Sequence, residues 1–380
     1  MLECVRVAGP VSRAQIARDS GLSKPTVSQA LTALVQAHLV REAGRSSGGK
    51  GPTAVLYELN PSAGWVVGVD VGRDWVRAAT ADLSGEVAGR NEEPAKPRSA
   101  KTLIAQIGRV ARAAAAEAGV AWSKVTVVAV ASPGVFGPDG DHPLFAHNLP
   151  GWGRQGLLDA VRAELRTEVI FENDVNLAAV GERWRGLGRG VDHFVFLHVG
   201  TGVGLGIVIG GELFRGATGA AGEVGYLPLA AADPHDPANR RRGALERAIG
   251  ADAVVRAARR AGIGIRELTP TRVFERARAG DARATAVVNE LGARIGLAIA
   301  AVVPILDPEL VILGGGIGGH IDQLMPAIQR ELKALSPFTP RIEASALGED
   351  AELAGAVAMA LDVAQERLFA RIEGKGSIAV

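Results

Sequence analysis

The sequence predicts an α/β protein in which a small N-terminal winged helix-turn-helix precedes a two-lobed α/β domain. Three observations predict this fold class. Two short helix patterns joined by a glycine-bearing turn lie near the N-terminus, and a basic hairpin pattern follows them. Beyond residue 60, apolar strands alternate with glycine turns and amphipathic helices. This pattern of strand, hairpin, helix and strand occurs twice, about 130 residues apart, which indicates two similar lobes around a cleft.

We therefore expect three units: a winged helix-turn-helix over residues 1–60, a first lobe over 61–190 and a second lobe over 191–380. The chain of 380 residues, 47% hydrophobic and 22% charged, is long enough for two or three cores. Residues 60–64 (NPSAG) have the composition of a short linker between the first two units.

Composition excludes several classes of protein. A single cysteine, Cys4, rules out an intramolecular disulfide and a zinc site built from several thiolates. No signal peptide is visible, and the apolar run over 295–306 is too short to span a bilayer. We expect a cytoplasmic protein without a membrane partner. The whole chain has a net charge of +1, but residues 1–60 carry seven basic against four acidic side chains, a local net charge of +3.

The first helix starts at Ser12, which can cap it, with Gln15 three residues later in the position of a capping box. It ends near Gly21. A second helix starts at Ser23 with Pro25 in its first turn, and Val27, Leu31, Leu34 and Val35 form its buried stripe. In a helix-turn-helix the N-terminal part of the second helix enters the major groove of DNA. The residues placed to contact bases and phosphates are Ser23, Lys24, Thr26, Ser28 and Gln29.

Two strand patterns, at residues 39–42 and 55–58, flank a glycine-rich segment that carries Arg45 and Lys50. A hairpin tip with two cations is suited to contact phosphates or the minor groove. The capped helix pair, the polar face and the basic wing together favour DNA binding. The alternative is a small helical bundle used for protein contact, with an ordinary surface hairpin.

Two glycine clusters, Gly200-Thr201-Gly202 and Gly314-Gly315, each follow an apolar strand. Backbone amides at such turns can face a phosphate, although glycine turns are common in a glycine-rich chain. Ligands of two-lobed α/β proteins bind in the cleft at the carboxyl ends of the strands.

Seven motifs occur in order along the chain: GVDVG at residues 68–72, SPG at 132–134, NLPGW at 148–152, ENDVN at 172–176, GTGVGLG at 200–206, GAAGEVG at 219–225 and VILGGG at 311–316. With these motifs the chain resembles the ROK family of repressors and sugar kinases over essentially its whole length. The resemblance implies an actin-like, ribonuclease H-like sugar-kinase fold, joined to the winged domain of the family's repressor branch.

The resemblance also implies a sugar site. By motif, the groups that hold sugar hydroxyls become Asn173, Asp174 and Glu223, with Glu246 from a later segment; in the kinases the aspartate is also the catalytic base. Asn148 and Tyr226 complete the predicted ligand set. The alternative reading treats the amide and carboxylates as helix caps and turn residues.

The sequence departs from the family's pattern at two places. Tyr226 stands where the family has a histidine, and the family's cysteine cluster is replaced by residues 233–246 (DPHDPANRRRGALE). The usual zinc ligands are absent and His235 is expected on the surface, so we expect no metal, and the loop must be held by other contacts. Position 74, where the kinases offer a hydroxyl, is an aspartate.

We therefore predict a ligand-responsive transcription repressor without catalytic residues or cofactors. Its expected partners are a double-stranded, inverted-repeat operator, a small sugar-like effector and further copies of itself, as a homodimer or homotetramer. Two alternative hypotheses remain. The protein is a sugar kinase that also binds DNA, or it is a regulator controlled by a protein partner instead of a small molecule.

Overall fold

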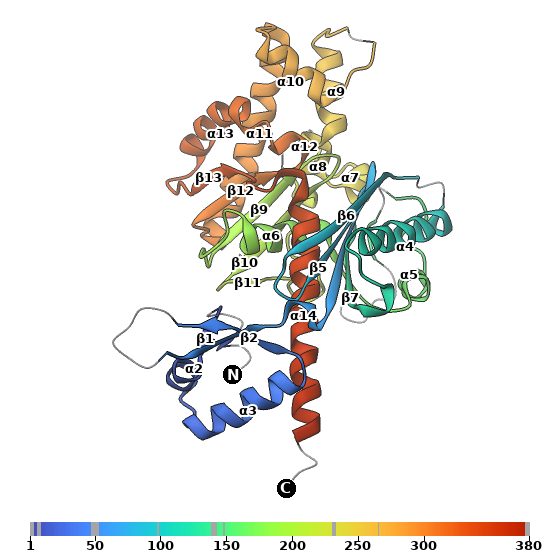
Figure 1. Cartoon of the computed structure of the whole chain (residues 1–380). Helices are drawn as coiled ribbons and strands as arrows, with labels where there is room; N and C mark the ends of the chain where they lie inside the picture. Colours follow the sequence, from blue (N-terminus) through green and yellow to red (C-terminus); the bar gives the residue numbers. More distant parts are fainter. Residues whose placement is uncertain are drawn as a thin grey trace.

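The computed structural model describes residues 4–5, 9–46, 53–96, 99–137, 143–146, 149–229, 233–264 and 266–376, with side chains described to residue 368. Within these ranges it forms a small N-terminal domain and two lobes, each built on a five-stranded sheet (Figure 1). The N-terminal domain and the two-lobed α/β architecture that the sequence predicts are confirmed.

The N-terminal domain is a winged helix-turn-helix. It contains α2 (Arg13–Ser20), α3 (Lys24–Gln36) and a sheet of order β1-β3-β2, formed by β1 (Val11–Ser12), β3 (Val55–Leu59) and β2 (Val40–Arg45). Ser12 caps α2 by accepting from the Gln15 amide at 3.2 Å, as expected. The reciprocal half of the capping box is absent, because the Gln15 side chain bonds Asp19 one turn later. Val27, Leu31 and Leu34 of α3 are buried against β2 and β3.

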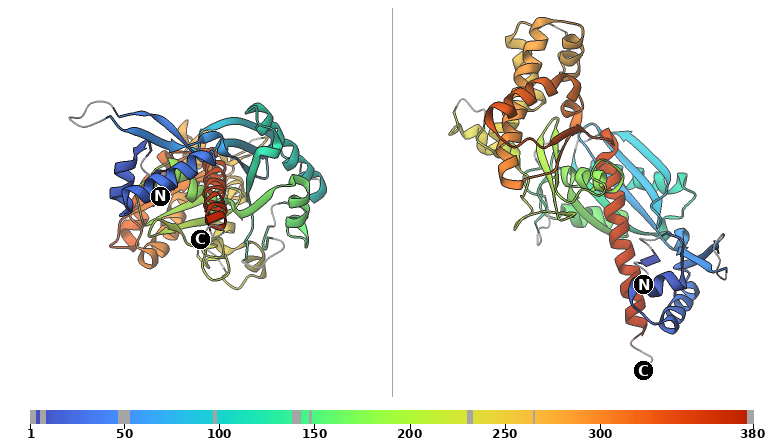
Figure 2. Two further views of the ribbon diagram at one scale, coloured as in Figure 1. Left: turned by 60° about the horizontal axis from the view of Figure 1, so that its bottom comes forward. Right: turned by 90° about the vertical axis from the view of Figure 1, so that its left-hand side faces the viewer.

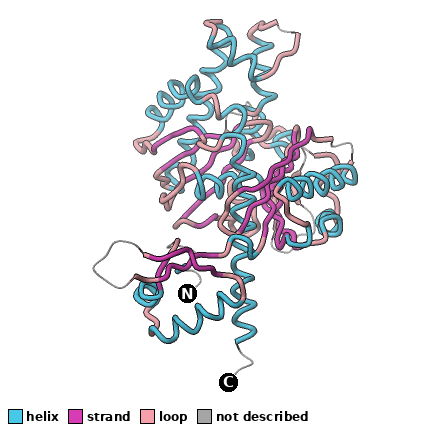
Figure 3. Tube along the Cα trace, in the orientation of Figure 1, coloured by secondary structure: helices cyan, strands magenta, loops and turns pink. Residues whose placement is uncertain are grey.

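The two lobes repeat one topology. The first sheet has the order β6-β5-β4-β7-β8, and the second has the equivalent order β11-β10-β9-β12-β13. Each is an antiparallel meander continued by two parallel strands. Figure 3 shows the strands of the two lobes as two groups with helices around them. The strands are β4 (Trp65–Val71), β5 (Trp75–Asp82), β6 (Val87–Pro94), β7 (Val125–Ser132), β8 (Glu168–Asn173), β9 (Phe194–Val199), β10 (Val203–Ile209), β11 (Glu212–Leu213), β12 (Leu310–Gly314) and β13 (Arg341–Ala344). The internal repeat predicted from the sequence is therefore confirmed.

The outer face of each sheet carries its own helices (Figures 1 and 2). On the first lobe these are α4 (Ala100–Glu117) and α5 (Leu157–Leu165), which bury an alanine- and valine-rich core. On the second lobe α8 (Ala244–Ile249), α11 (Ala282–Leu306) and α13 (Ile321–Leu335) build the core beside the sheet, and α9 (Ala251–Arg260) and α10 (Pro270–Arg278) pack on α11, farther from the strands. Among the described helices, α11 alone is long and apolar enough to cross a membrane, and half of its most apolar stretch is buried inside the protein.

Two helices lie between the sheets, and each covers the sheet of the other lobe. Helix α6 (Asp174–Arg185) follows β8 of the first sheet, yet its Val175, Ala178 and Ala179 pack on β9, β10 and β12. Helix α14 (Ala351–Gly376) follows β13 of the second sheet, yet its Leu353, Ala356 and Ala360 pack on β4, β5 and β7. A boundary at residue 190 lies between the strands of the two sheets but does not separate these helices, because each apolar helix face fits the opposite sheet.

Close backbone approach allows this crossing. A Cβ at Gly68 of β4 would lie 2.7 Å from the Val357 amide nitrogen of α14, and one at Gly355 of α14 would overlap the Leu177 carbonyl oxygen of α6. Contacts this tight keep α6, α14 and the two inner sheet faces in one packed layer at the centre of the molecule.

Candidate DNA-binding face and ligand cleft

The first part of α3 presents an exposed polar face. Ser23 caps the helix by accepting from the Thr26 amide at 3.3 Å, and its hydroxyl also lies 2.7 Å from the Thr26 hydroxyl. These two hydroxyls therefore serve the helix end. Within the part of the chain that the structure describes, the side chains of Lys24, Ser28 and Gln29 make no hydrogen bond or ion pair, and Lys24 and Gln29 are exposed. They are the groups left available for a nucleic acid.

The wing is formed by β2 and β3. Arg45, the last residue of β2, is exposed at the start of the hairpin tip. Lys50 lies outside the described residues. An ion pair between Arg41 and Glu58, at 2.7 Å, ties the two strands together on their exposed side. Its exposed cation adds the basic character that a phosphate backbone attracts.

Between the lobes lies a cleft of about 1120 Å³. Five of the six predicted ligand-binding residues fall in the described part of the chain, and all five line the cleft together with both glycine turns; Asn148 lies outside the described residues. The lining set comprises Asp174, Glu223, Tyr226, Glu246, Gly200, Thr201, Gly202, Gly314 and Gly315, and Asn173 joins it from the end of β8. A cavity of this size exceeds what one monosaccharide fills.

Most of the hydrogen-bonding capacity of the Asn173 side chain is used within the protein. Its side-chain oxygen accepts from the amides of Val175 and Asn176 at 2.9 and 3.1 Å, and its side-chain nitrogen donates to the Gly134 carbonyl at 3.1 Å. Asn173 is therefore the N-cap of α6, as the alternative interpretation of this residue as a helix cap expects. Asp174, the first residue of α6, keeps one carboxylate oxygen toward the cleft, because only Oδ1 accepts from the Val175 amide. Burial raises the pKa of Asp174, although nearby His198 opposes the shift.

Glu223 directly precedes, and Tyr226 ends, the short 3-10 turn Val224–Tyr226, which comes before the substituted loop. Burial, followed by the neighbouring Asp174 and Glu246 carboxylates, raises the pKa of Glu223 to about 7. Tyr226 lies edge-on to Phe145 with 5.8 Å between ring centroids. A carboxyl that is easily protonated beside an aromatic pair provides hydrogen bonds and an apolar surface for one ligand.

The carboxylate of Glu246 forms contacts within the protein as well as facing the cleft. Its Oε2 accepts from the Val203 amide at 3.2 Å and its Oε1 pairs with Arg242 at 2.9 Å. The same arginine also pairs with Asp252. Glu246 thus fixes the start of β10 against α8, in addition to facing the cleft.

Ion pairs hold the loop that lacks the family's cysteines. Asp236 caps the short α7 (Pro237–Arg242) and pairs with Arg247 at 2.8 Å. Arg247 also donates to the Asn239 side chain at 2.5 Å. His235 is exposed, as expected. The described residues include no group of three histidine, cysteine or carboxylate side chains placed to hold a metal, and the absence of zinc stays a prediction.

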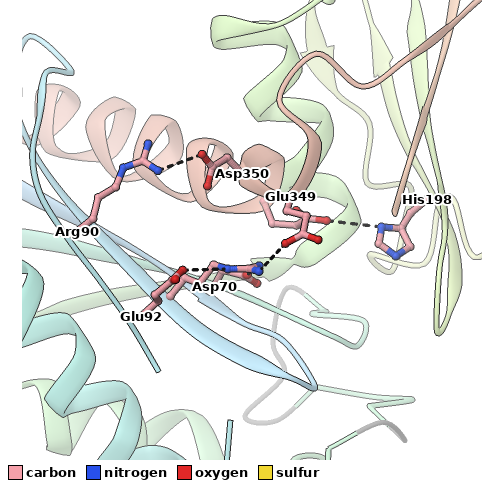
Figure 4. A network of polar contacts seen from close by, with 8 residues as sticks. Asp70, Arg90, Glu92, His198, Glu349 and Asp350 are labelled. Carbon is pink, nitrogen blue, oxygen red and sulfur yellow. Dashed lines mark hydrogen bonds and ion pairs between the residues drawn. The ribbon is translucent and has the colours of Figure 1, made fainter. Parts of the chain in front are cut away.

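The other end of the cleft, beside the glycine turns, contains a second polar cluster (Figure 4). Asp70 of β4 lies 3.4 Å from Arg77, and His198 of β9 lies 3.6 Å from Glu352 of α14. Burial, followed by the Glu352 carboxylate, raises the pKa of Asp70 to about 8. Burial alone would lower the pKa of His198, but Glu352, Asp174 and Asp70 raise it above its usual value. This part of the cleft therefore brings two acidic and two basic side chains together beside the glycine turns.

Sequence reasoning did not select His198, Glu352 or Phe145. His198 lies two residues before Gly200, so a polar side chain near the end of a buried strand was the available signal. No local sequence pattern marks Glu352 or Phe145 as a cleft residue, because each depends on a partner from another part of the chain: His198 for Glu352 and Tyr226 for Phe145.

Comparisons with known proteins agree with this architecture. Residues 66–363 match the model of the ROK family, and residues 1–44 match the IclR helix-turn-helix domain. The xylose repressor of Caldicellulosiruptor bescii is 27% identical over 370 residues, which cover 92% of each chain. The glucokinase of Halalkalibacterium halodurans is 31% identical over 311 residues, which cover 77% of this chain and 93% of the enzyme.

A solved ROK family transcriptional regulator, a homologue of the Escherichia coli MLC protein, superposes with a TM-score of 0.78 over 95% of this chain and 94% of its own, at 22% identity. At this identity the superposition supports the fold alone. The family match covers more than half of the chain and both lobes of the cleft. This chain is a member of the ROK family.

Proposed function

We propose that this ROK protein is a DNA-binding transcription repressor that a sugar-like ligand controls from the cleft. The observation that carries the proposal is that one chain combines an exposed polar recognition face on α3 with a carboxylate-lined cleft. The alignment with the xylose repressor spans 92% of this chain and therefore includes residues of both parts.

The DNA-binding role rests on α3. Lys24 and Gln29 project from its N-terminal half without partners among the described residues, where a recognition helix contacts base edges. Arg45, and Lys50 by its place in the sequence, would contact phosphates from the wing. A homodimer or a homotetramer would present these faces in pairs, as an inverted-repeat operator requires. Such a regulator acts in the cytoplasm.

The ligand role rests on the wall formed by Asp174, Glu223 and Tyr226. Carboxylate oxygens accept hydrogen bonds from hydroxyl groups, and the Tyr226–Phe145 pair offers an aromatic surface to the C–H face of a sugar ring. The carboxylates make phosphorylated sugars poor ligands, since like charges repel strongly at partly buried sites. We therefore propose an unphosphorylated polyhydroxylated effector.

The DNA contact is tested by a matched pair of glutamines on one helix. The full chain first selects an operator from a random duplex library. Gln29→Ala should then weaken operator binding by about 1–3 kcal/mol and relax the preference at one base pair, because a bidentate contact to a base is lost. Gln36→Ala, at the exposed C-terminal end of the same helix, should leave binding unchanged. Selection of no specific sequence by the full chain would refute DNA recognition altogether.

The ligand site is tested with the same operator. Pentoses, hexoses, N-acetylhexosamines and their phosphates are screened for release of the DNA. Asp174→Ala should abolish release by the active sugar while leaving operator affinity in its absence intact, because Asp174 faces the cleft and lies far from α3 in the chain. Asp159→Ala, on the exposed side of α5, is the control and should respond as the wild type does. If the active sugar still released the Asp174→Ala variant from the operator, the sugar would bind at another site.

A further inference from the structure

The first lobe presents a large aromatic side chain to the cleft. Phe145, in the segment between β7 and α5, lines the cleft, and 54% of its surface is exposed. Its ring lies edge-on to Tyr226 of the second lobe, with 5.8 Å between the ring centroids. A ring exposed to this extent contributes only part of the stability that full burial would give, and the rest of its apolar surface is open to a ligand.

The backbone conformation of Phe145 is unfavourable for a residue of this size. Its φ is +58°, in the left-handed region where the Cβ of an L residue crowds a neighbouring carbonyl oxygen. A glycine would adopt this conformation without strain. The chain instead places a large ring there, and strained residues that the surrounding structure holds in place gather at functional sites.

Contacts on both sides of Phe145 hold it in this conformation. Before it, the backbones of Val135 and Leu144 exchange two hydrogen bonds, at 2.9 and 3.0 Å. After it, Ala146 is buried in the core of the first lobe. With Leu144 bonded on one side and Ala146 buried on the other, the ring of Phe145 is directed away from the core of its own lobe.

The loop of Phe145 adjoins the wall that is proposed to bind the sugar. Asn173, the N-cap of α6, donates to the Gly134 carbonyl at 3.1 Å, so the start of α6 is bonded to this loop. On the second lobe, the Tyr226 amide donates to the Glu223 carbonyl at 3.1 Å within the 3-10 turn. Tyr226 therefore adjoins both Glu223, which is suited to hydroxyl groups, and the ring of Phe145.

The surroundings of Phe145 on the first lobe are apolar. The described segments 133–137 (PGVFG) and 143–146 (PLFA) contain no side chain that can form a hydrogen bond, and Leu144 is also exposed. Hydroxyl groups of a second sugar unit at this place would find no side-chain partner in these segments, which weakens binding. An aromatic group needs no such partner, and it gains by stacking and by the removal of apolar surface from water.

We propose that Phe145 determines the specificity of the cleft, and that the effector is a glycoside in which an aromatic group is attached to the sugar. The sugar contacts Asp174, Glu223 and Tyr226, and the aromatic group continues onto Phe145. A cleft of about 1120 Å³ has room for both parts. The identity of the ligand rests on the proposed function, whereas the strained placement of Phe145 rests on the fold alone.

Thermal unfolding tests the placement of Phe145 without a ligand. Phe145→Gly and Phe145→Ala both remove the ring, but only glycine relieves the backbone strain, so Phe145→Gly should unfold about 2 °C above Phe145→Ala. Phe338 is the matched control, because it is 53% exposed, lies outside the lining of the cleft and has no left-handed φ. There the order should reverse, since glycine gives the unfolded chain more freedom than alanine. A Phe145→Ala variant as stable as Phe145→Gly would overturn the strained placement and the inference with it.

Calorimetry with paired glycosides tests the ligand class on the full chain. The probes are xylose, glucose and N-acetylglucosamine, each as the free sugar and as the methyl and 4-nitrophenyl glycosides of both anomers. For the sugar that binds, the nitrophenyl glycoside should bind about tenfold more tightly than the methyl glycoside, because its ring stacks on Phe145. Phe145→Ala should reduce this preference to about twofold and leave the affinity for the methyl glycoside within about twofold of the wild type. Phe338→Ala should keep the full preference.

Three results would overturn the inference and leave a sugar effector in place: binding of the free sugar alone, equal affinity of the wild type for the two glycosides, or an unchanged preference in Phe145→Ala. Binding of none of these sugars and glycosides would instead refute the proposed sugar effector, and this ligand class with it. The two failures are therefore distinguishable in one set of titrations.

Discussion

Glu223 shows how one side chain makes the cleft sensitive to pH. Its pKa of about 7 in the folded protein exceeds its ordinary value of 4.5, because burial and the Asp174 carboxylate disfavour the charged form. The folded chain therefore holds a proton that the unfolded chain releases. The resulting stability is full below pH 4.5 and is lost as the pH rises through 7.

Glu223→Gln stays neutral at every pH and should remove this loss. Its free energy of unfolding should match the wild type near pH 5 and exceed it by about 1–3 kcal/mol at pH 8. Urea unfolding from pH 5 to 8 measures the difference. Glu366→Gln, on the exposed side of α14, should follow the wild type throughout. Parallel curves for wild type and Glu223→Gln would contradict the raised pKa.

Residue roles could be predicted from the sequence where they are local. Ser12 and Ser23 were identifiable as caps because a cap bonds an amide only three residues away. Asp174, Glu223 and Tyr226 could be placed in one site from family motifs. The Tyr226–Phe145 pair and the His198–Glu352 contact could not, because each joins segments that only the tertiary fold brings together.

At the scale of elements, the crossing of α6 and α14 depends on glycine. Gly355→Ala should destabilise the protein by about 3 kcal/mol, because the new methyl group overlaps the Leu177 carbonyl and the helices must separate. Gly264→Ala is the control: it adds a methyl group in open space at an ordinary backbone angle and should change stability by no more than about 0.5 kcal/mol. Thermal unfolding compares the two variants. Equal midpoints would show that the helix pair has room to adjust.

The order of strands was predictable, whereas the placement of these helices was not. Strand patterns and glycine turns repeat in the sequence, so two equivalent sheets followed from the repeat. An apolar helix face, however, does not specify which of two similar sheets it will cover. The glycines at 68, 181 and 355 mark close approaches, but the sequence does not state their partners.

At the scale of the whole molecule, the cleft between the lobes combines two kinds of lining. Glu223 and Tyr226 are suited to hydroxyl groups, whereas the glycine turns in the same cleft would face a nucleotide. Beside these turns lie the Glu352 carboxylate and Asp70, whose pKa of about 8 keeps it mostly protonated at neutral pH, and Asp74 is exposed at the rim. Relatives that are kinases share the fold, so catalysis depends on these local charges.

We predict that the protein is not an efficient sugar kinase. Phosphoryl transfer depends on positioning and on stabilising charge around the phosphates. A carboxylate about 4 Å from a phosphate oxygen costs about 1 kcal/mol in water and about 4 kcal/mol near a protein surface. Asp174 retains the position of the family's base, but a base alone does not bind the nucleotide.

An ADP-release assay over hexoses, pentoses and amino sugars measures this directly, with the Halalkalibacterium halodurans glucokinase as the positive control. Turnover should remain well below the ordinary enzyme range of about 1–1000 per second. Glu352→Ala removes one of the opposing carboxylates without touching Asp174, so nucleotide binding measured by calorimetry should tighten in this variant even though turnover stays low. Wild-type turnover within the ordinary range, abolished by Asp174→Asn, would establish a working kinase. In that case the carboxylates at the glycine turns would have to be screened by groups that approach only when the lobes close.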